Sequence, residues 1–132
     1  MDRIRFALGL LSFCMTIGAR PALAEDSLIT QDGSFSKATI TQHGLGDTAS
    51  LYQHLGVSNI GAITQSGSAN QATIEQCGDG NQASLVQQGH GNTMEIIQEN
   101  GHNKITQTQI GDNLSDSIHQ TGGMSVTVTQ TR

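Results

Sequence analysis

Apolar and polar positions alternate along most of this chain, and the alternation restarts about every 11 residues. The recurring pattern is Asn-x-Ala-x-Ile-x-Gln, and it is clearest over residues 70–76 and 81–87. Because successive side chains of a β-strand point to opposite faces, Asn, Ala, Ile and Gln share one face. The positions between them are largely Thr, Ser and charged residues, which suit an exposed strand face. The pattern predicts a series of short strands that each have one inward face.

A glutamine closes every unit of the pattern. Seven of the nine intervals between successive glutamines are 11 residues long, one is 12 and one is 10. Such regular repetition indicates one small structural unit copied along the chain. We expect an inward polar ladder formed by Gln31, Gln42, Gln53, Gln65, Gln76, Gln87, Gln98, Gln109, Gln120 and Gln130, together with Asn59, Asn70, Asn81, Asn92 and Asn103.

A short turn separates each strand from the next and contains a glycine, which adopts positive φ without steric cost. The expected turn glycines are Gly33, Gly44, Gly56, Gly67, Gly78, Gly89, Gly111 and Gly122. The segments between them predict ten strands, with approximate bounds 26–31, 36–42, 47–53, 58–65, 70–76, 81–87, 92–98, 103–109, 114–120 and 124–130.

Two successive strands folded face to face form a coil of 22 residues with its apolar side chains inside. Stacking five such strand-turn-strand coils gives an all-β fold, a two-sheet parallel β-solenoid with amyloid-like cross-β stacking. Glutamine then lies on glutamine, and each amide can both donate and accept along the column, which satisfies polar groups that are costly to bury. The expected apolar core is Ile29, Ala38, Ile40, Ala49, Leu51, Ile63, Ala72, Ile74, Ala83, Leu85, Met94, Ile96, Ile105, Ile118, Val126 and Val128.

The ends of this solenoid are expected to be open. Two large apolar side chains per coil cannot offset the entropy of ordering 22 residues, so the backbone and amide ladders must supply the balance. Ladders need a neighbour above and below, and the repeat shows no dissimilar cap at either end. Because open strand edges template pairing with another chain, we expect end-to-end polymerisation.

Residues 1–24 lie outside the repeat. Arg3 and Arg5 precede an apolar run over residues 6–17, and Ala22-Leu23-Ala24 provides a small-x-small cleavage pattern. This is typical of a secretory signal peptide and too short for a membrane-spanning helix. We therefore expect residues 25–132 to form one exported domain, with no membrane span after the signal peptide is removed.

Charge and cysteine content narrow the possible partners. Residues 25–132 carry three cations against ten carboxylates, a formal charge of −7. Such a chain lacks the clustered Lys and Arg that nucleic acids need, so no nucleic-acid partner is expected. Cys77 is the single cysteine in this range. It could pair between molecules, but we favour a small side chain in a turn.

The same residues resemble the curlin family, the secreted subunits of bacterial curli amyloid fibres. The family repeat reads Ser-x5-Gln-x-Gly-x-x-Asn-x-Ala-x-x-x-Gln over about 22 residues. Residues 70–76 and 81–87 match it with the preceding Gln and Gly in place. The first unit matches at Ser27, Gln31, Gly33, Ala38 and Gln42, with Ser36 in the place of Asn.

The resemblance implies a structural subunit or nucleator of extracellular fibres at the bacterial cell surface, which serve surface adhesion and biofilm formation. The implied partners are further copies of the chain, a second curlin-like subunit and an outer-membrane curli-type secretion pore. The ending 124–132 and the segment 91–98 resemble the minor, nucleating subunit, although the basic residues typical of that subunit's last repeat are represented only by Arg132.

Two features depart from the family pattern. Only Glu25 and Asp26 stand between the signal peptide and the first repeat, where the family carries a segment that the secretion pore recognises. In the later units Gln107 takes an Ile position and Asp116 an Ala position. An inward carboxylate is costly unless it has a partner, so we expect the last third to be less stable or less self-adhesive.

Catalytic, metal and cofactor chemistry is not expected. His43 and His54 each follow a ladder glutamine and could stack one strand apart, but no ligand spacing accompanies the five histidines. We interpret them as solvated turn and surface residues. Asp32, Asp47, Asp79 and Asp112 are interpreted as turn formers that also slow aggregation.

A secreted β-solenoid that binds or adheres without polymerising is the alternative function. Outward Thr-x-Thr pairs at 39–41, 106–108 and 127–129 resemble the flat hydroxyl arrays of ice-binding solenoids. The corresponding sites of other strands include Tyr52, Glu75 and Ile97, which interrupt the array. The fibre interpretation therefore remains the favoured one.

Overall fold

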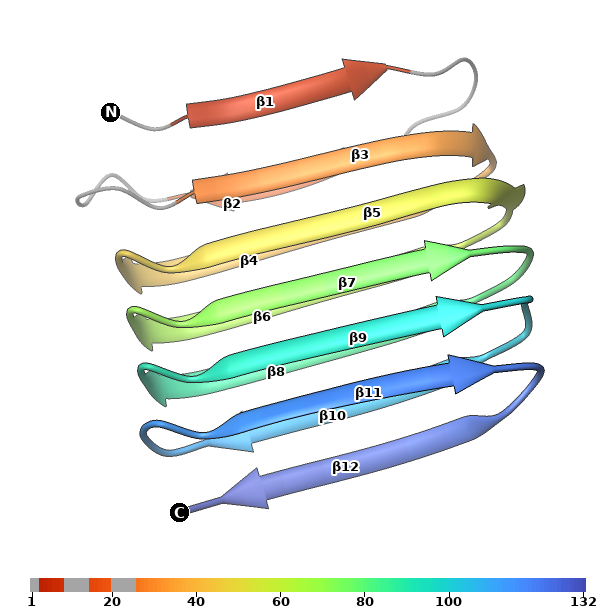
Figure 1. The fold of residues 1–132 in the computed structure, drawn as a ribbon. Helices are drawn as coiled ribbons and strands as arrows, with labels where there is room; N and C mark the ends of the chain where they lie inside the picture. Colours follow the sequence, from red (N-terminus) through yellow and green to blue (C-terminus); the bar gives the residue numbers. More distant parts are fainter. Residues whose placement is uncertain (1–2, 9–14, 20–25) are drawn as a thin grey trace.

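The computed structural model describes residues 3–8, 15–19 and 26–132, and these residues form strands and turns without a helix. The strands form two facing layers, and within each layer they follow one another down the molecule (Figure 1). In chain order they are β1 Arg3–Leu8, β2 Met15–Ala19, β3 Asp26–Ser34, β4 Lys37–Leu45, β5 Thr48–Val57, β6 Ile60–Ser68, β7 Gln71–Cys77, β8 Gln82–His90, β9 Thr93–Glu99, β10 Lys104–Ile110, β11 Ser115–Thr121 and β12 Ser125–Thr131.

Successive strands alternate between two parallel sheets. The first sheet has the order β1-β3-β5-β7-β9-β11, and the second has the order β12-β10-β8-β6-β4-β2. Each odd strand and the even strand after it form one coil, so β3–β12 make five coils. The predicted two-sheet parallel β-solenoid is confirmed.

The register places equivalent residues of successive coils directly on one another. In the first sheet Gln53 pairs with Gln76, and in the second sheet Gln65 pairs with Gln87. A shift of one residue would turn the apolar set towards water, so the alternating pattern fixes this register. The 12-residue interval is absorbed at one point: Asp32 pairs with His54 but Gly33 pairs with Gly56, which leaves Leu55 as the extra residue of a bulge.

The strands of the first four coils extend beyond the predicted ends in several cases. β4, for example, continues to Leu45 instead of ending at Gln42, and Gly44 pairs with Gly67 inside the ladder. The expected turn is therefore partly strand, because backbone pairing continues through the glycines. In this part of the chain five of the turns that remain are two residues long, and those after β7 and β9 are four residues long.

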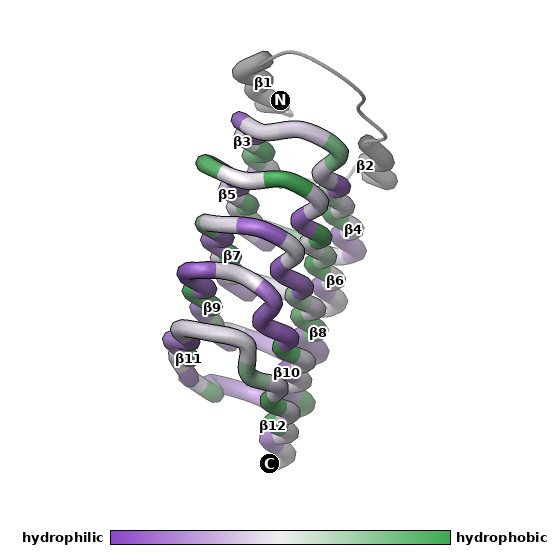
Figure 2. Tube along the Cα trace, turned by 90° about the vertical axis from the view of Figure 1, so that its right-hand side faces the viewer, coloured by the Kyte–Doolittle hydropathy of each residue, from purple (hydrophilic) through white to green (hydrophobic). Residues whose placement is uncertain are grey.

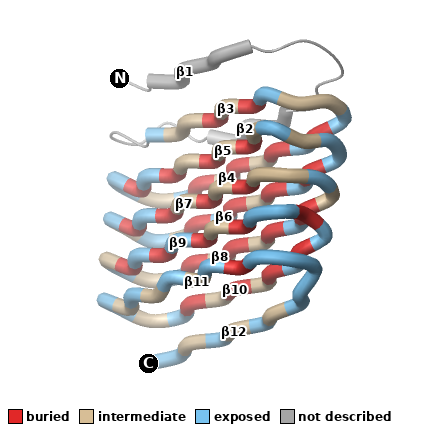
Figure 3. The backbone as a smooth tube through the Cα atoms, turned by 45° about the vertical axis from the view of Figure 1, so that its right-hand side comes forward, coloured by how far each residue is buried: buried red, intermediate tan, exposed pale blue. Residues whose placement is uncertain are grey.

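Buried residues occupy the inward face of every strand from β3 to β10 (Figure 3). Thirteen apolar side chains form one continuous core between the sheets, and all thirteen belong to the expected set. Ile118, Val126 and Val128 differ from expectation because they are only half-buried. They lie on β11 and β12, the last strands of the two sheets, where only one side of each strand is covered by another coil.

The predicted signal peptide lies largely outside the described residues, including its cleavage site. Two segments of it, β1 and β2, pair in parallel with β3 and β4 at the N-terminal end of the stack. Among the described residues, none forms a helix that is long and apolar enough to cross a membrane.

Candidate assembly interface

Glutamine side chains form a hydrogen-bonded column inside the first sheet. The Nε2 of Gln53 donates to the Oε1 of Gln76 at 2.8 Å, and the Nε2 of Gln76 donates to the Oε1 of Gln98 at 2.8 Å. Gln31 precedes them and donates to Gln53, while Gln120 follows and accepts from Gln98 at 3.5 Å. We call this column of five glutamines the first amide ladder.

A second amide ladder runs through the other sheet in the same way. Gln42 donates to Gln65 at 2.9 Å, Gln65 to Gln87 at 2.8 Å, and Gln87 to Gln109 at 3.2 Å. The last rung, Gln130, accepts from Gln109 at 2.8 Å. Nine of the ten glutamines are buried, and Gln130 is half-buried on the terminal strand.

The second N–H of the central glutamines crosses the core to a backbone carbonyl of the opposite sheet. Gln53 reaches the carbonyl of Lys37 at 3.0 Å, and Gln76 reaches that of Ile60 at 3.0 Å. Gln76 therefore makes three bonds although its side chain is fully buried. This satisfies the amide donors inside an interior where an unmade hydrogen bond is costly, and it ties the two sheets together.

Both ladders have a direction. Each bond between two ladder glutamines runs from the Nε2 of one coil to the Oε1 of the coil on its C-terminal side. The direction has a consequence at the last rung of the first ladder. The Nε2 of Gln120 is buried and has no hydrogen-bond partner within the described residues.

The asparagine column differs from a simple amide ladder. The Oδ1 of Asn59 accepts from the backbone N of Asn81 at 2.9 Å, and the Oδ1 of Asn81 accepts from the backbone N of Asn103 at 3.2 Å. Asn70 and Asn92 form the equivalent column at the start of the odd strands. These buried side chains therefore hold the turn backbone of the next coil, with amide-to-amide contact at Asn103 and Asn81.

Asp47 belongs to this column. It lies in the two-residue turn between β4 and β5, as predicted, but the prediction that it is a solubilising residue is wrong. Its side chain is fully buried, and its Oδ1 accepts from the backbone N of Asn70 at 2.9 Å and from Asn70 Nδ2 at 3.1 Å. A signal was present in the sequence, because Asp47 precedes Thr48-Ala49 as Asn70 precedes Gln71-Ala72.

Asp79 and Asp112 also lie in turns. Their Oδ1 atoms accept from the backbone N of Val57 and of His90, each at 2.9 Å. Each carboxylate therefore fastens a turn to the coil that precedes it. Asp32 lies exposed near the end of β3.

Two columns of glycine allow the coils to stack closely at the edges. A Cβ added to Gly67 would lie 1.9 Å from the carbonyl oxygen of Gly89, and one added to Gly89 would lie 1.9 Å from that of Gly111. Gly33 and Gly56 make similarly close approaches on the opposite edge. The equivalent backbone approach is missing at Gly122, around which a Cβ would meet nothing within 4 Å.

The two late departures from the repeat contact each other. Gln107 Nε2 on β10 donates to Asp116 Oδ2 on β11 at 2.7 Å, across the space between the sheets. The inward carboxylate is thus partnered in this structure. The Oε1 of Gln107, in contrast, is buried without a hydrogen-bond partner.

The histidines are dispersed over the surface. His43 and His54 do not stack, because they lie on β4 and β5, which belong to different sheets. His54 contacts Glu75 at 3.1 Å, and His119 contacts Glu99 at 3.1 Å. Among the described residues no group of three or more His, Cys, Asp or Glu could hold a metal ion.

Cys77 is a free, partly exposed thiol at the end of β7.

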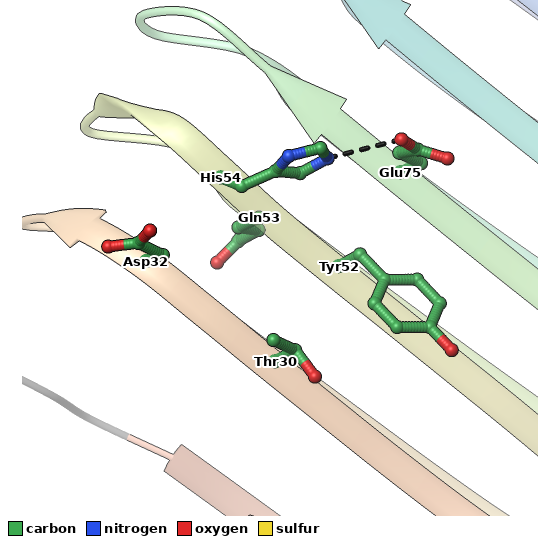
Figure 4. A pocket seen from close by; sticks show the side chains of 6 residues that line it. All are labelled: Thr30, Asp32, Tyr52, Gln53, His54 and Glu75. Carbon is green, nitrogen blue, oxygen red and sulfur yellow. Dashed lines mark hydrogen bonds and ion pairs between the residues drawn. The ribbon is translucent and has the colours of Figure 1, made fainter. Parts of the chain in front are cut away.

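A shallow hollow of about 400 Å³ lies on the outer face of the first sheet, where Thr30, Asp32, Tyr52, His54 and Glu75 surround it (Figure 4). His54 points towards Glu75, and Tyr52 lies along the strand away from this pair. The hollow is open to solvent, and its imidazole, that of His54, is already paired with the Glu75 carboxylate. Its side chains show no arrangement of a nucleophile with a base.

The edge formed by the turns after the odd strands changes character along the molecule. It is apolar near β3 and β5, hydrophilic near β7 and β9, and intermediate in hydropathy near β11 (Figure 2). Phe35 and Leu55 are the most exposed large apolar side chains, at 73% and 74%, and both have positive φ, 58° and 53°. Bulky residues rarely adopt this conformation, so the two turns carry some backbone strain.

Comparison with known proteins agrees with the geometry of the repeat. Residues 56–89 and 67–99 each match the family model of the curlin associated repeat. The two overlapping matches cover coils that contain the most regular rungs of both amide ladders. No curated protein and no solved structure matched the chain. Within residues 56–99 the chain is therefore similar to the curlin associated repeat.

Proposed function

We propose that this protein is a subunit of extracellular curli-type amyloid fibres and that it assembles end to end through its amide ladders. The observation that carries the proposal is the buried Nε2 of Gln120, a hydrogen-bond donor at the last rung of the first amide ladder that has no acceptor within the described residues. A buried donor without an acceptor costs free energy that a further coil would recover. The terminal strands β11 and β12 also present unpaired backbone edges at the ends of their sheets.

The direction of the amide ladders determines that the C-terminal end of one solenoid docks on the N-terminal end of the next. A donor at the C-terminal end needs an acceptor, and the first rung of the ladder, Gln31, passes its donor on to Gln53. Continuing the observed register would place β3 of the next copy on β11 and β4 of the next copy on β12. Gln31 of that copy would then follow Gln120, and its Gln42 would follow Gln130. Such an interface is heterologous and produces an open filament instead of a closed dimer.

Assembly in this form requires the N-terminal end of β3 and β4 to be free. We propose that residues 1–24 are a signal peptide, whose removal also frees the strand edges that β1 and β2 occupy. The fibre would lie at the bacterial cell surface and serve adhesion and biofilm formation. A curli-type secretion pore and a second curlin-like subunit are the proposed partners, and a nucleating role is slightly favoured over that of the major subunit.

The test uses the chain as it is exported by an expressing bacterium, with its N-terminus determined by mass spectrometry. We expect a mass that begins at Glu25 and, at micromolar concentration, fibres that bind thioflavin after a lag. Their diffraction should show spacings of about 4.7 and 10 Å. Gln120→Ala should lengthen the lag and slow elongation, while Thr121→Ala, at the exposed end of the same strand, should change little.

Two results would contradict the proposal. A chain that stays monomeric for days would favour a secreted solenoid that binds without polymerising. Equal kinetics for the two variants would show that the ladder does not form the junction. The nucleating role has its own readout in the same assay, because a sub-stoichiometric amount should shorten the lag of another curlin subunit.

A further inference from the structure

Asp116 occupies a position that is apolar in the three coils before it and that Ser27 occupies in the first coil of the sheet. The register stacks it on Met94, which in turn lies on Ala72 and Ala49. These three side chains are buried, whereas Asp116 is half-exposed because β11 is the last strand of the first sheet. A carboxylate therefore stands on the inward face at the end where the next copy would dock.

The contacts of Asp116 are suited to two protonation states. In its charged form it accepts from Gln107 Nε2 at 2.7 Å and from the backbone N of Ser117 at 3.0 Å. The same Gln107 amide carries a buried Oε1 that lacks a partner. A protonated carboxyl group has an O–H to donate, and this Oε1 is an acceptor beside it that the charged form leaves unused.

No cation faces Asp116 from the described elements packed against it. The inward residues around it are Met94 and Ile96 on β9, Ile105 and Gln107 on β10, Ile118 on β11, and Val126 and Val128 on β12, and none of these titrates. The nearby charged residues Glu95, Glu99, Lys104 and His119 occupy outward positions of their strands. Burial of the charged form is therefore not offset by an ion pair.

We propose that Asp116 is a charge gate at the C-terminal end of the solenoid, which makes addition of the next copy faster when this carboxyl group is protonated. The inference rests on the proposed end-to-end assembly. In the register described above, Ser27 and Ile29 of the incoming copy cover Asp116 and Ile118. Docking then removes water from the exposed side of the carboxylate, and a neutral carboxyl group is far less costly to bury than a charged one.

The consequence has a definite sign. At neutral pH each junction must bury a charge or bind the proton that neutralises it, so elongation is slowed. At acidic pH the group is neutral before docking and its O–H can bond to Gln107 Oε1, so the barrier is lowered. Because the charge is buried only when a copy docks, the elongation rate should depend on pH. This pH dependence should vanish when residue 116 cannot ionise.

The test measures elongation from preformed wild-type seeds at about pH 7 and about pH 3, where aspartates are charged and mostly protonated, respectively. Three exported chains are compared: wild type, Asp116→Asn and Asp32→Asn. The last is the matched control, because Asp32 is an exposed carboxylate on β3 and its replacement changes the net charge equally. We expect Asp116→Asn to elongate about tenfold faster than wild type at neutral pH and at a similar rate at acidic pH. The ratio for Asp32→Asn should stay near one at both.

A second variant covers the possibility that Asn at position 116 disturbs the fold. Gln107→Ile combined with Asp116→Ala restores the apolar pattern of the earlier coils and should also elongate faster at neutral pH. Equal ratios for Asp116→Asn and Asp32→Asn at both pH values, with fibres present, would overturn the gate and leave end-to-end assembly standing. Failure of every chain to form fibres would instead overturn the proposed assembly, and the gate with it.

Discussion

At Gly67 and Gly89 the coils approach so closely that a single methyl group would overlap the carbonyl oxygen of the next coil. These positions need glycine for two reasons, since they also have positive φ, 124° and 127°. Glutamine is required at the ladder positions because of hydrogen bonding and not because of close packing. A fully buried amide such as that of Gln76 is tolerated because donors and acceptors are met in both directions along the stack.

Replacing Gly67 by Ala should separate the steric requirement from the conformational one. Gly122→Ala is the control, because Gly122 also has positive φ, 79°, but open space around it. We expect the control to cost about 1 kcal/mol through backbone strain and Gly67→Ala to cost about 3 kcal/mol or more through the added clash. The guanidinium concentration that dissolves half of the assembled protein measures both. Similar midpoints for the two variants would show that the coils do not stack as closely as described.

At the level of the strand, one face carries the specificity and the other tolerates variation. The inward face repeats Asn, Ala, Ile or Leu, and Gln from coil to coil, and the register pairs each with its equivalent. The outward face varies freely: Ser50, Thr73 and Glu95 share one column. The inward residues of each strand therefore determine its register in the sheet, and the outward residues do not.

Gln76→Ala should weaken the fold and its assembly far more than Thr73→Ala on the outward face of the same strand. The first substitution removes three hydrogen bonds and leaves a buried acceptor on Gln98 without a donor. Each such group costs about 1–3 kcal/mol. Denaturant midpoints and elongation rates of the two variants provide the comparison. If they were equally impaired, glutamine would not be the inward ladder.

The strands also show what a sequence can and cannot predict here. The period-two pattern predicted the buried faces because a packed interior tolerates one parity only. It did not predict that β4 continues to Leu45, since pairing through a glycine depends on the neighbouring coil. The contact between Gln53 and the carbonyl of Lys37 joins different sheets and leaves no mark in composition. Asp47 was correctly predicted to lie in a turn, but its burial was missed because it depends on the contact with Asn70 of the next coil.

At the level of the whole molecule, the solenoid is a stack whose backbone pairing and amide ladders continue along one axis. Interior coils have neighbours on both sides, and the last coil has its neighbour on one side only, which leaves Ile118, Val126 and Val128 half-buried. The orphaned Gln120 Nε2 and the inward Asp116 lie on this same coil. The first feature favours a further copy and the second slows its arrival at neutral pH.

The claim that the first amide ladder continues from one molecule to the next can be tested most directly by solid-state NMR. Fibres would be grown from an equal mixture of ¹⁵N-labelled and ¹³C-labelled chains, so that every ¹⁵N–¹³C contact is intermolecular. We predict a contact between the side-chain ¹⁵N of Gln120 and the side-chain carbonyl ¹³C of Gln31, at hydrogen-bond range. Fibres in which Gln120 contacts Gln120, or in which Gln31 shows no intermolecular contact, would contradict the account.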